Sequence, residues 1–238
     1  MNDAKWERWA AATGIGFVVL ALITFFMVPA PPKLDAPVGK IVDYYVKHRT
    51  AQALSFYIGA LAFVVLFLWF LGSLRSFLMR AEGSPGRLSA VAFGAGLVFI
   101  AVVAVAALAA QTLTLGAAAS GNEALIRALY VAANVGFSAV SFPIAVLAAA
   151  TSLVVLRTKA LPQWYGQVGA IVALLFLGLG GVVTRSSGAF SPTGVFGLIG
   201  FLLFLVWTLV TSILLVQRVG KAAAPAMTPG IEAPSSTM

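Results

Sequence analysis

The sequence predicts an all-α protein, a polytopic transmembrane bundle of six helices with a short outer amphipathic helix. Two observations carry this prediction. Of the 238 residues, 61% are hydrophobic and only 9% are charged, whereas a soluble globular domain carries about 25% charged residues. The apolar residues also gather in six runs, each close to the roughly 20 residues that a helix needs to cross the hydrocarbon core.

The composition also limits the chemistry. The chain has no cysteine and a single histidine, His48, which excludes disulfides, thiolate metal sites and sites built from several histidines of one chain. We therefore expect no metal and no cofactor. The net charge of +8 comes from basic residues at the ends of the apolar runs, where they contact lipid headgroups. Membrane lipids, and not nucleic acid, are the expected partners.

The ends of the chain differ in composition from its centre. We expect residues 1–8 to form a cytoplasmic N-terminal segment, residues 9–218 the six-span domain and residues 219–238 a disordered cytoplasmic tail. The tail is rich in Ala, Pro, Ser and Thr and has no periodicity, which is typical of disorder. The first apolar run, residues 9–29, is too long for a signal peptide and lacks a positive leader, so it predicts a retained helix.

Residues 38–48 predict the short outer helix. Ile41 and Tyr45 fall on one side of such a helix, while Lys40 and Lys47 lie largely elsewhere. This pattern is typical of a helix that rests on the membrane surface. The second span, residues 51–71, follows it.

The third span, residues 89–110, is rich in Ala and Gly. Small residues let helix backbones approach closely, so we expect this span to pack against the fourth. A turn that contains Pro162 precedes the fifth span, which runs to Thr184, and the sixth span covers residues 194–216.

The fourth span, residues 127–157, is the one around which we expect the other helices to pack. Tyr130, Asn134, Ser138 and Ser141 recur in it at helical spacing, so they stack on one face of the helix. A mild polar stripe on an otherwise apolar helix favours burial of that stripe inside a membrane bundle.

Pro143 lies near the middle of the same span. It removes an amide donor and displaces the carbonyl of Ala139, for which the hydroxyls of Ser138 and Ser141 are candidate partners. Two interpretations of the span stay open. Its polar side chains bond to neighbouring helices, or the kinked helix lines a small polar cavity for a ligand.

Trp207 falls near the middle of the sixth span rather than at an interface. Its indole N–H needs an acceptor if the ring faces protein. One interpretation is ordinary packing with local bonds to helix carbonyls; the other is an outward-facing Trp and Phe surface that seats another membrane subunit. The candidate ligand-binding residues are thus Tyr130, Asn134, Ser138, Ser141, Pro143 and Trp207.

A second candidate set is the outer polar cluster, which brings both charge signs to the segments expected outside the membrane. Its members are Asp43, Tyr45, His48, Arg49, Glu123, Arg127 and Arg185. Ion pairs among the acidic and basic members would pin the outer helix over the bundle. Three interpretations of the cluster stay open. It is a solvated loop with interfacial tyrosines, a binding site for a headgroup, anion or partner protein, or a site of acid–base chemistry around His48.

No Asp, Glu, Lys, Arg or His lies in the central part of any span. Ionisable groups inside a membrane are costly and usually functional, so their absence from these sequence positions argues against proton relays and intramembrane proteolysis. The sequence also lacks a P-loop and an HExxH motif. We expect the protein not to be an enzyme.

The basic residues also predict the orientation. Six spans place both termini on one side, and with the termini inside, nine of the 15 Lys and Arg residues fall in inner segments. Because basic residues are enriched on the cytoplasmic side, we expect cytoplasmic termini.

Four features together resemble a known group of proteins. They are Trp6 before the first span, the proline-rich stretch after it, the segment DYYVKHRT at 43–50 and the turn LRTKALPQW at 156–164. This combination is similar to a group of uncharacterised bacterial six-helix membrane proteins that carries a domain-of-unknown-function label. The resemblance implies a multi-pass protein of the bacterial inner membrane and brings no substrate, cofactor or catalytic residue.

We therefore expect a non-catalytic membrane protein that binds a lipid, a hydrophobic molecule or a partner membrane subunit, including a second copy of itself. The alternative is a small-solute transporter with a site at the kinked fourth span.

Overall fold

The computed structural model describes residues 3–222, and every element within that range is helical. The elements, in chain order, are α1 (Asp3–Met27), α2 (Val38–Lys47), α3 (Arg49–Ala60), the π-helical turn η1 (Leu61–Leu66), α4 (Phe67–Glu82), α5 (Arg87–Leu115), the 3-10 turn η2 (Ala117–Ala119), α6 (Glu123–Ala139), α7 (Ser141–Thr158), α8 (Gln163–Leu179), the 3-10 turn η3 (Gly180–Thr184) and α9 (Val195–Ala222). The predicted all-α class is confirmed.

Six stretches of the described chain are long and apolar enough to cross a membrane. The first, third and sixth are single helices, α1, α5 and α9. The second joins α3, η1 and α4, the fourth joins α6 and α7, and the fifth joins α8 and η3. Each contains a window with a mean hydropathy between 2.1 and 2.7. The chain is thus a multi-pass membrane protein, as the run lengths predict.

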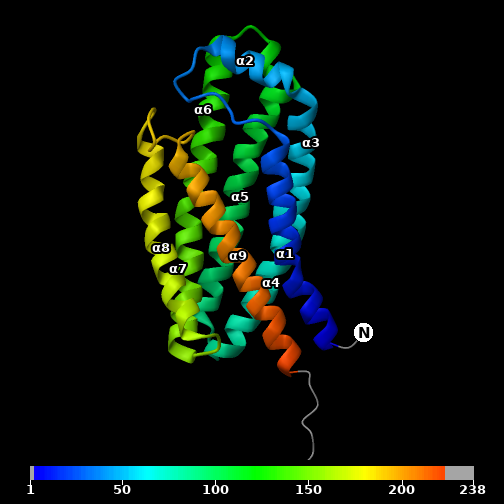
Figure 1. Ribbon diagram of the computed structural model, residues 1–238, viewed down its shortest axis with the longest axis vertical. Helices are drawn as coiled ribbons and strands as arrows, with labels where there is room; N and C mark the ends of the chain where they lie inside the picture. Colours follow the sequence, from blue (N-terminus) through cyan, green and yellow to red (C-terminus); the bar gives the residue numbers. More distant parts are fainter. Residues whose placement is uncertain (1–2, 223–238) are drawn as a thin grey trace, which may run out of the picture.

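The helices form an elongated bundle with two different ends (Figure 1). α2 lies across one of them, here called the α2 end. α1 begins and α9 finishes at the opposite end, here called the terminal end, which also holds the turns from α4 to α5 and from α7 to α8. The predicted even number of crossings requires this arrangement.

The fourth span is the most buried of the six. In an apolar stretch of 18 residues within this span, 61% of the residues are buried, whereas the corresponding stretches of the other five spans are 22–44% buried. α7 packs against α4, α5 and α8, whereas α1 packs mainly on α9 and α4. The other helices were expected to pack around the fourth span. Of these, α4, α5 and α8 do so, whereas α1 packs mainly on other helices.

The third and fourth spans approach each other closely, as the small residues predict. A Cβ added to Gly136 of α6 would lie 2.8 Å from the Cβ of Ala106 in α5. Real Cβ atoms do not come this close, so the contact depends on the missing side chain of Gly136.

The fourth span is interrupted near Pro143, as predicted. α6 ends at Ala139 and α7 begins at Ser141, with Val140 between them. Pro143 is buried in the first turn of α7, where its missing N–H removes no intrahelical bond that the new helix needs. The break therefore divides the central span into two helices at its middle.

The predicted short outer helix is present as α2, and its apolar side packs on protein instead of on lipid. Ile41 and Tyr45 are almost fully buried and cluster with Leu113 of α5 and with Ile126 and Tyr130 of α6. An amphipathic helix has the same pattern on a bilayer and on a bundle end. Here the end of α5 and the start of α6 provide the apolar surface.

Two helices extend beyond the spans expected from the sequence. α1 begins at Asp3, because its polar first turns continue the helix of the apolar run. α9 continues to Ala222, so residues 219–222 of the predicted tail are helical. The rest of that tail, residues 223–238, lies outside the described residues.

Candidate functional site

A cavity of about 370 Å³ lies inside the bundle, between its middle and its α2 end. All six spans contribute to its wall, and no charged side chain lines it. Eight of its lining residues are phenylalanines: Phe25, Phe63, Phe99, Phe137, Phe176, Phe196, Phe201 and Phe204. We call this space the phenylalanine cavity.

Three hydroxyl groups are the polar side chains of the wall, and each donates to a carbonyl of its own span. Thr24 Oγ1 donates to Ala21 O at 2.8 Å, and Ser141 Oγ donates to Ser138 O at 2.9 Å. The third, Ser138 Oγ, donates to the carbonyl of Asn134 at 3.0 Å. Because the donors are used, the hydroxyl oxygens offer the cavity acceptors only.

These bonds correct the predicted role of the two serines beside the proline break. Their hydroxyls were candidate partners for the carbonyl of Ala139, yet they bond the carbonyls of Asn134 and Ser138. A hydroxyl in a helix reaches the carbonyl three or four residues back most easily. Within the described chain, the side chains of the stripe form no hydrogen bond to another transmembrane span. Tyr130 bonds to the connection after α1, as described below.

The wall of the cavity is thin on two sides. Phe25 and Phe137 both line the cavity, and they are 41% and 45% exposed on the outside of the bundle. The outside of a multi-pass bundle at this level is lipid. Phe25 and Phe137 therefore lie at the boundary between the cavity and the surrounding lipid.

The predicted ligand-binding set is only partly brought together. Ser138 and Ser141 line the cavity, whereas Tyr130, Asn134, Pro143 and Trp207 do not. The side-chain amide of Asn134 donates to Tyr130 O at 2.8 Å. Sequence reasoning missed the phenylalanines, because six separate helical segments must fold before these residues face one space.

Trp207 faces the core, which supports the first of the two interpretations, ordinary packing, and contradicts the alternative of an outward Trp and Phe surface for a partner subunit. Its indole is buried and stacks on Phe204, with ring centroids 6.4 Å apart. Thr211 Oγ1 donates to Trp207 O at 2.6 Å and lies 2.6 Å from the hydroxyl of Tyr165. Ser212 Oγ donates to Ala11 O of α1. Local bonds to carbonyls therefore account for part of this polarity.

Four buried polar atoms near this region have no hydrogen-bond partner among the described residues. They are Thr151 Oγ1, Ser152 Oγ, Trp207 Nε1 and Thr208 Oγ1. Gly169 of α8 lies beside Ser152 Oγ and Trp207 Nε1, so its missing side chain lets these groups from α7 and α9 approach. The pair Thr151–Ser152 in an apolar run is the signal by which the sequence could have indicated this polar core.

The outer polar cluster contains no ion pair within the described chain, so the predicted salt bridges over the bundle are wrong. Arg127 donates instead to the carbonyls of Leu34 and Ala36, at 2.9 and 2.8 Å. Arg49 donates to the carbonyl of Leu115 at 3.3 Å. Carbonyls left unpaired in the loop and at the end of α5 compete successfully with the carboxylates for these guanidinium groups.

Only part of this cluster acts together. Tyr45 faces Tyr130, with ring centroids 6.3 Å apart, and the Tyr130 hydroxyl donates to Pro32 O. His48 lies beside Tyr44 at 5.5 Å between ring centroids. The remaining members, Asp43, Glu123 and Arg185, are exposed. The cluster therefore fastens the connection after α1 onto α6, and it does not form a single pocket.

Burial keeps the two tyrosines of α2 neutral. Desolvation raises the pKa of Tyr44 to about 12, and a hydrogen bond with the side chain of Gln52 opposes this rise. Desolvation also raises the pKa of Tyr45, with a further contribution from Tyr44. Both groups are hydrogen-bond donors at neutral pH, and the Tyr44 hydroxyl donates to Pro29 O at 2.8 Å.

The fold and the cavity define a multi-pass, all-α membrane protein with an apolar internal space. Comparison with known proteins adds no relative, because no protein-family model, curated protein or solved structure matches the chain significantly.

Proposed function

We propose that the protein binds a hydrophobic molecule from the bilayer in the phenylalanine cavity and has no catalytic activity. The observation that carries this proposal is the wall itself, which has eight phenylalanines, three hydroxyls and no charged group around about 370 Å³. Pockets for small molecules have volumes of roughly 300–1,000 Å³ and mostly apolar linings with few polar groups. The occupant fits best as an apolar molecule with one weak hydrogen-bond donor facing the serine oxygens.

The wall supports binding better than catalysis. A catalytic site needs a general base, a nucleophile activated by one, or a metal. The hydroxyls of Ser138 and Ser141 are bonded to helix carbonyls, and no ionisable group shares the cavity with them. These groups can orient a ligand, but they have no partner for proton transfer.

The geometry gives less support to a small-solute transporter with its site at the kinked fourth span. Asn134 is the most polar side chain between Arg127 and Arg157, but its amide is bonded to Tyr130 O and it does not line the cavity. A polar solute would meet phenylalanine rings at the break. The break is therefore better suited to making room for an apolar occupant.

We further propose that the protein resides in a bacterial inner membrane with cytoplasmic termini. Two points support this location: nine of the 15 basic residues lie at the terminal end or in the inner loops by the sequence count, and the motifs around 43–50 and 156–164 resemble those of a bacterial group.

The decisive experiment identifies what the protein retains when it is extracted together with native lipid. Native mass spectrometry of the wild type should show one apolar molecule bound in stoichiometric amount. Val103→Phe should remove it, because Val103 of α5 is buried and lines the cavity. Val105→Phe is the matched control, since Val105 is exposed on the same helix. Equal retention by the two variants, or an empty wild type, would contradict the proposal.

A further inference from the structure

A second space, of about 540 Å³, lies in a groove between α1 and α4 toward the terminal end. Trp6 of α1 and Trp69 of α4 stand along it, with ring centroids 5.0 Å apart and planes at 75°. Both indoles are about half exposed. Tryptophan is enriched at the level of the lipid headgroups, so the pair indicates that the groove opens at this interface.

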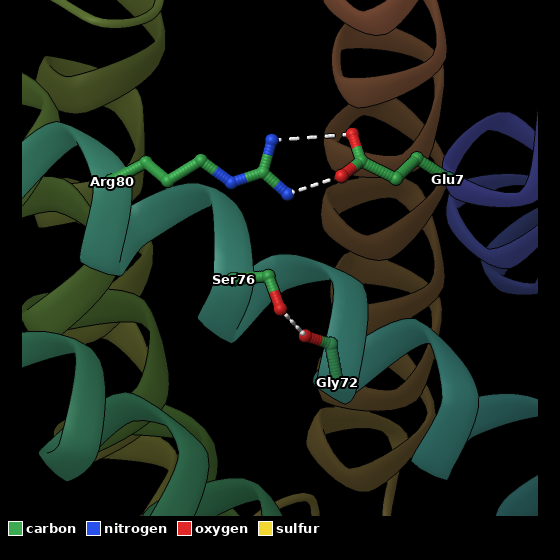
Figure 2. Close-up of polar contacts among 4 residues, drawn as sticks. All are labelled: Glu7, Gly72, Ser76 and Arg80. Carbon is green, nitrogen blue, oxygen red and sulfur yellow. Dashed lines mark hydrogen bonds and ion pairs between the residues drawn. The ribbon is translucent and has the colours of Figure 1, made fainter. Parts of the chain in front are cut away.

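The groove is closed on one side by an ion pair between Glu7 and Arg80 (Figure 2). Arg80 Nη1 donates to Oε2 of Glu7 at 3.2 Å, and Nη2 donates to Oε1 at 2.5 Å. This is the one salt bridge within the described chain. The side chain of Arg80 is 60% exposed and that of Glu7 is 37% exposed, so a molecule outside the bundle can reach both.

Both charged groups can take a second partner. A guanidinium has five N–H donors and a carboxylate has about four acceptor positions, and the pair uses two of each. A phosphate can therefore bind Arg80 while an ammonium group binds Glu7. The two indoles strengthen the second contact, because the faces of tryptophan rings attract cations.

Gly72 of α4 leaves the groove open at its centre. A Cβ added to Gly72 would meet nothing within 4 Å, so the missing side chain leaves space between the two tryptophans and the ion pair. The hydroxyls of Ser73 and Ser76 donate to the carbonyls of Trp69 and Gly72 in their own helix, and Figure 2 shows the second of these bonds. Their oxygens remain available as acceptors for an ammonium group.

We propose that this groove binds a zwitterionic phospholipid whose headgroup ends in an ammonium group. The phosphate contacts Arg80, the ammonium contacts Glu7 and the indoles, and an acyl chain lies along the apolar residues Leu68 and Leu215, which also line the groove. The site is distinct from the phenylalanine cavity and shares no lining residue with it.

The net charge of the protein and the charges of the groove predict opposite lipid preferences. A chain with a net charge of +8 attracts anionic lipids non-specifically. Glu7 acts against that preference inside the groove, because its carboxylate repels a second anion. A specific preference for a zwitterionic headgroup is therefore opposite to what the net charge alone predicts.

The test measures lipid binding to the delipidated, full-length protein by native mass spectrometry, with phosphatidylethanolamine and phosphatidylglycerol of identical acyl chains as probes. The wild type should bind the first more tightly. Gly72→Leu should weaken this binding by about tenfold or more, because the new side chain fills the groove. Gly59→Leu is the matched control, since Gly59 lies on the same span and also has open space around it.

Two further variants test the roles of the charges. Glu7→Gln should remove the preference for phosphatidylethanolamine, and Arg80→Gln should weaken binding of both lipids. An exposed ion pair contributes little to folding, so both variants should fold. Tighter binding of phosphatidylglycerol by the wild type, or unchanged phosphatidylethanolamine binding by Gly72→Leu, would overturn the inference. Val103→Phe should leave this binding unchanged, which separates the groove from the cavity.

Discussion

Phe204 lines the phenylalanine cavity and stacks on the indole of Trp207, with ring centroids 6.4 Å apart. The ring planes are inclined by only 21°. Trp207 is therefore the tryptophan placed to report on the contents of the cavity, while Trp6, Trp9, Trp69 and Trp164 are exposed on the outside.

This arrangement predicts quenching of Trp207 by an apolar bromine-bearing probe. In a variant that keeps Trp207 and replaces the other four tryptophans by phenylalanine, a long-chain bromoalkane should quench the fluorescence with a saturable dependence on concentration. Val103→Phe in that background should abolish the saturable part, and Val105→Phe should not. Quenching that never saturates would show that the probe acts only from the surrounding detergent or lipid.

A second prediction concerns the contact of Gly136 with Ala106. Gly136→Leu should destabilise the protein by about 1–3 kcal/mol, because an added side chain forces α5 and α6 apart. Thermal unfolding in detergent measures the effect. Gly94→Leu is the control, since a Cβ there meets nothing within 4 Å; a similar loss in both variants would mean that the close approach is not the cause.

A third prediction concerns Arg127. Arg127→Gln should loosen the connection between α1 and α2, because two charge-assisted bonds to Leu34 O and Ala36 O are lost, each worth about 1.5–3 kcal/mol when buried. Hydrogen exchange of residues 29–37 should accelerate. Glu123→Gln should change nothing in this segment, because Arg127 forms no ion pair with it; an equal effect of the two variants would restore the salt-bridge interpretation.

A fourth prediction concerns alkaline pH. The pKa of Tyr44 rises from 10 to about 12 in the folded protein. The unfolded chain therefore loses this proton first, and the contribution of Tyr44 to stability is complete below pH 10 and disappears as the pH rises to about 12. Tyrosinate absorbance of the wild type minus that of Tyr44→Phe should show this late titration. A difference titrating at pH 10 would mean that Tyr44 is not packed as described.

A fifth prediction concerns topology. Reporter fusions should place Ser120, at the α2 end, outside the cytoplasm and the C-terminus inside it. The physical reason is the excess of basic residues in the segments at the terminal end. An external C-terminus, or both fusions on the same side, would contradict the proposed orientation.

The number of spans was predictable, because the lengths of apolar runs report directly on bilayer thickness. The break at Val140 was predictable as well, since Pro143 acts on its own helix. The position of α2 was not, because its pattern fits a membrane surface and a bundle end equally. Nor was the orientation of Trp207, which lies in a helix that is apolar on nearly all sides.

The two candidate sites were harder still to predict. Two of the cavity residues, Ser138 and Ser141, stood out as polar exceptions in an apolar span. The phenylalanines did not, because they are ordinary membrane residues until the fold turns them toward one space. Glu7 and Arg80 are 73 residues apart in the chain, and a sequence gives no sign that their charges meet.

The π-helical turn η1 has a consequence for how the second span tolerates changes in length. A π turn closes its bonds over five residues instead of four, so residues 61–66 hold one residue more than a regular helix would need. Deletion of Val64 should convert the turn to α-helix while the faces presented by α3 and α4 stay in register. Phe63, which lines the cavity from this turn, would lose its position. The surplus residue thus gives the span a place where a deletion leaves the bundle intact and reshapes only the cavity.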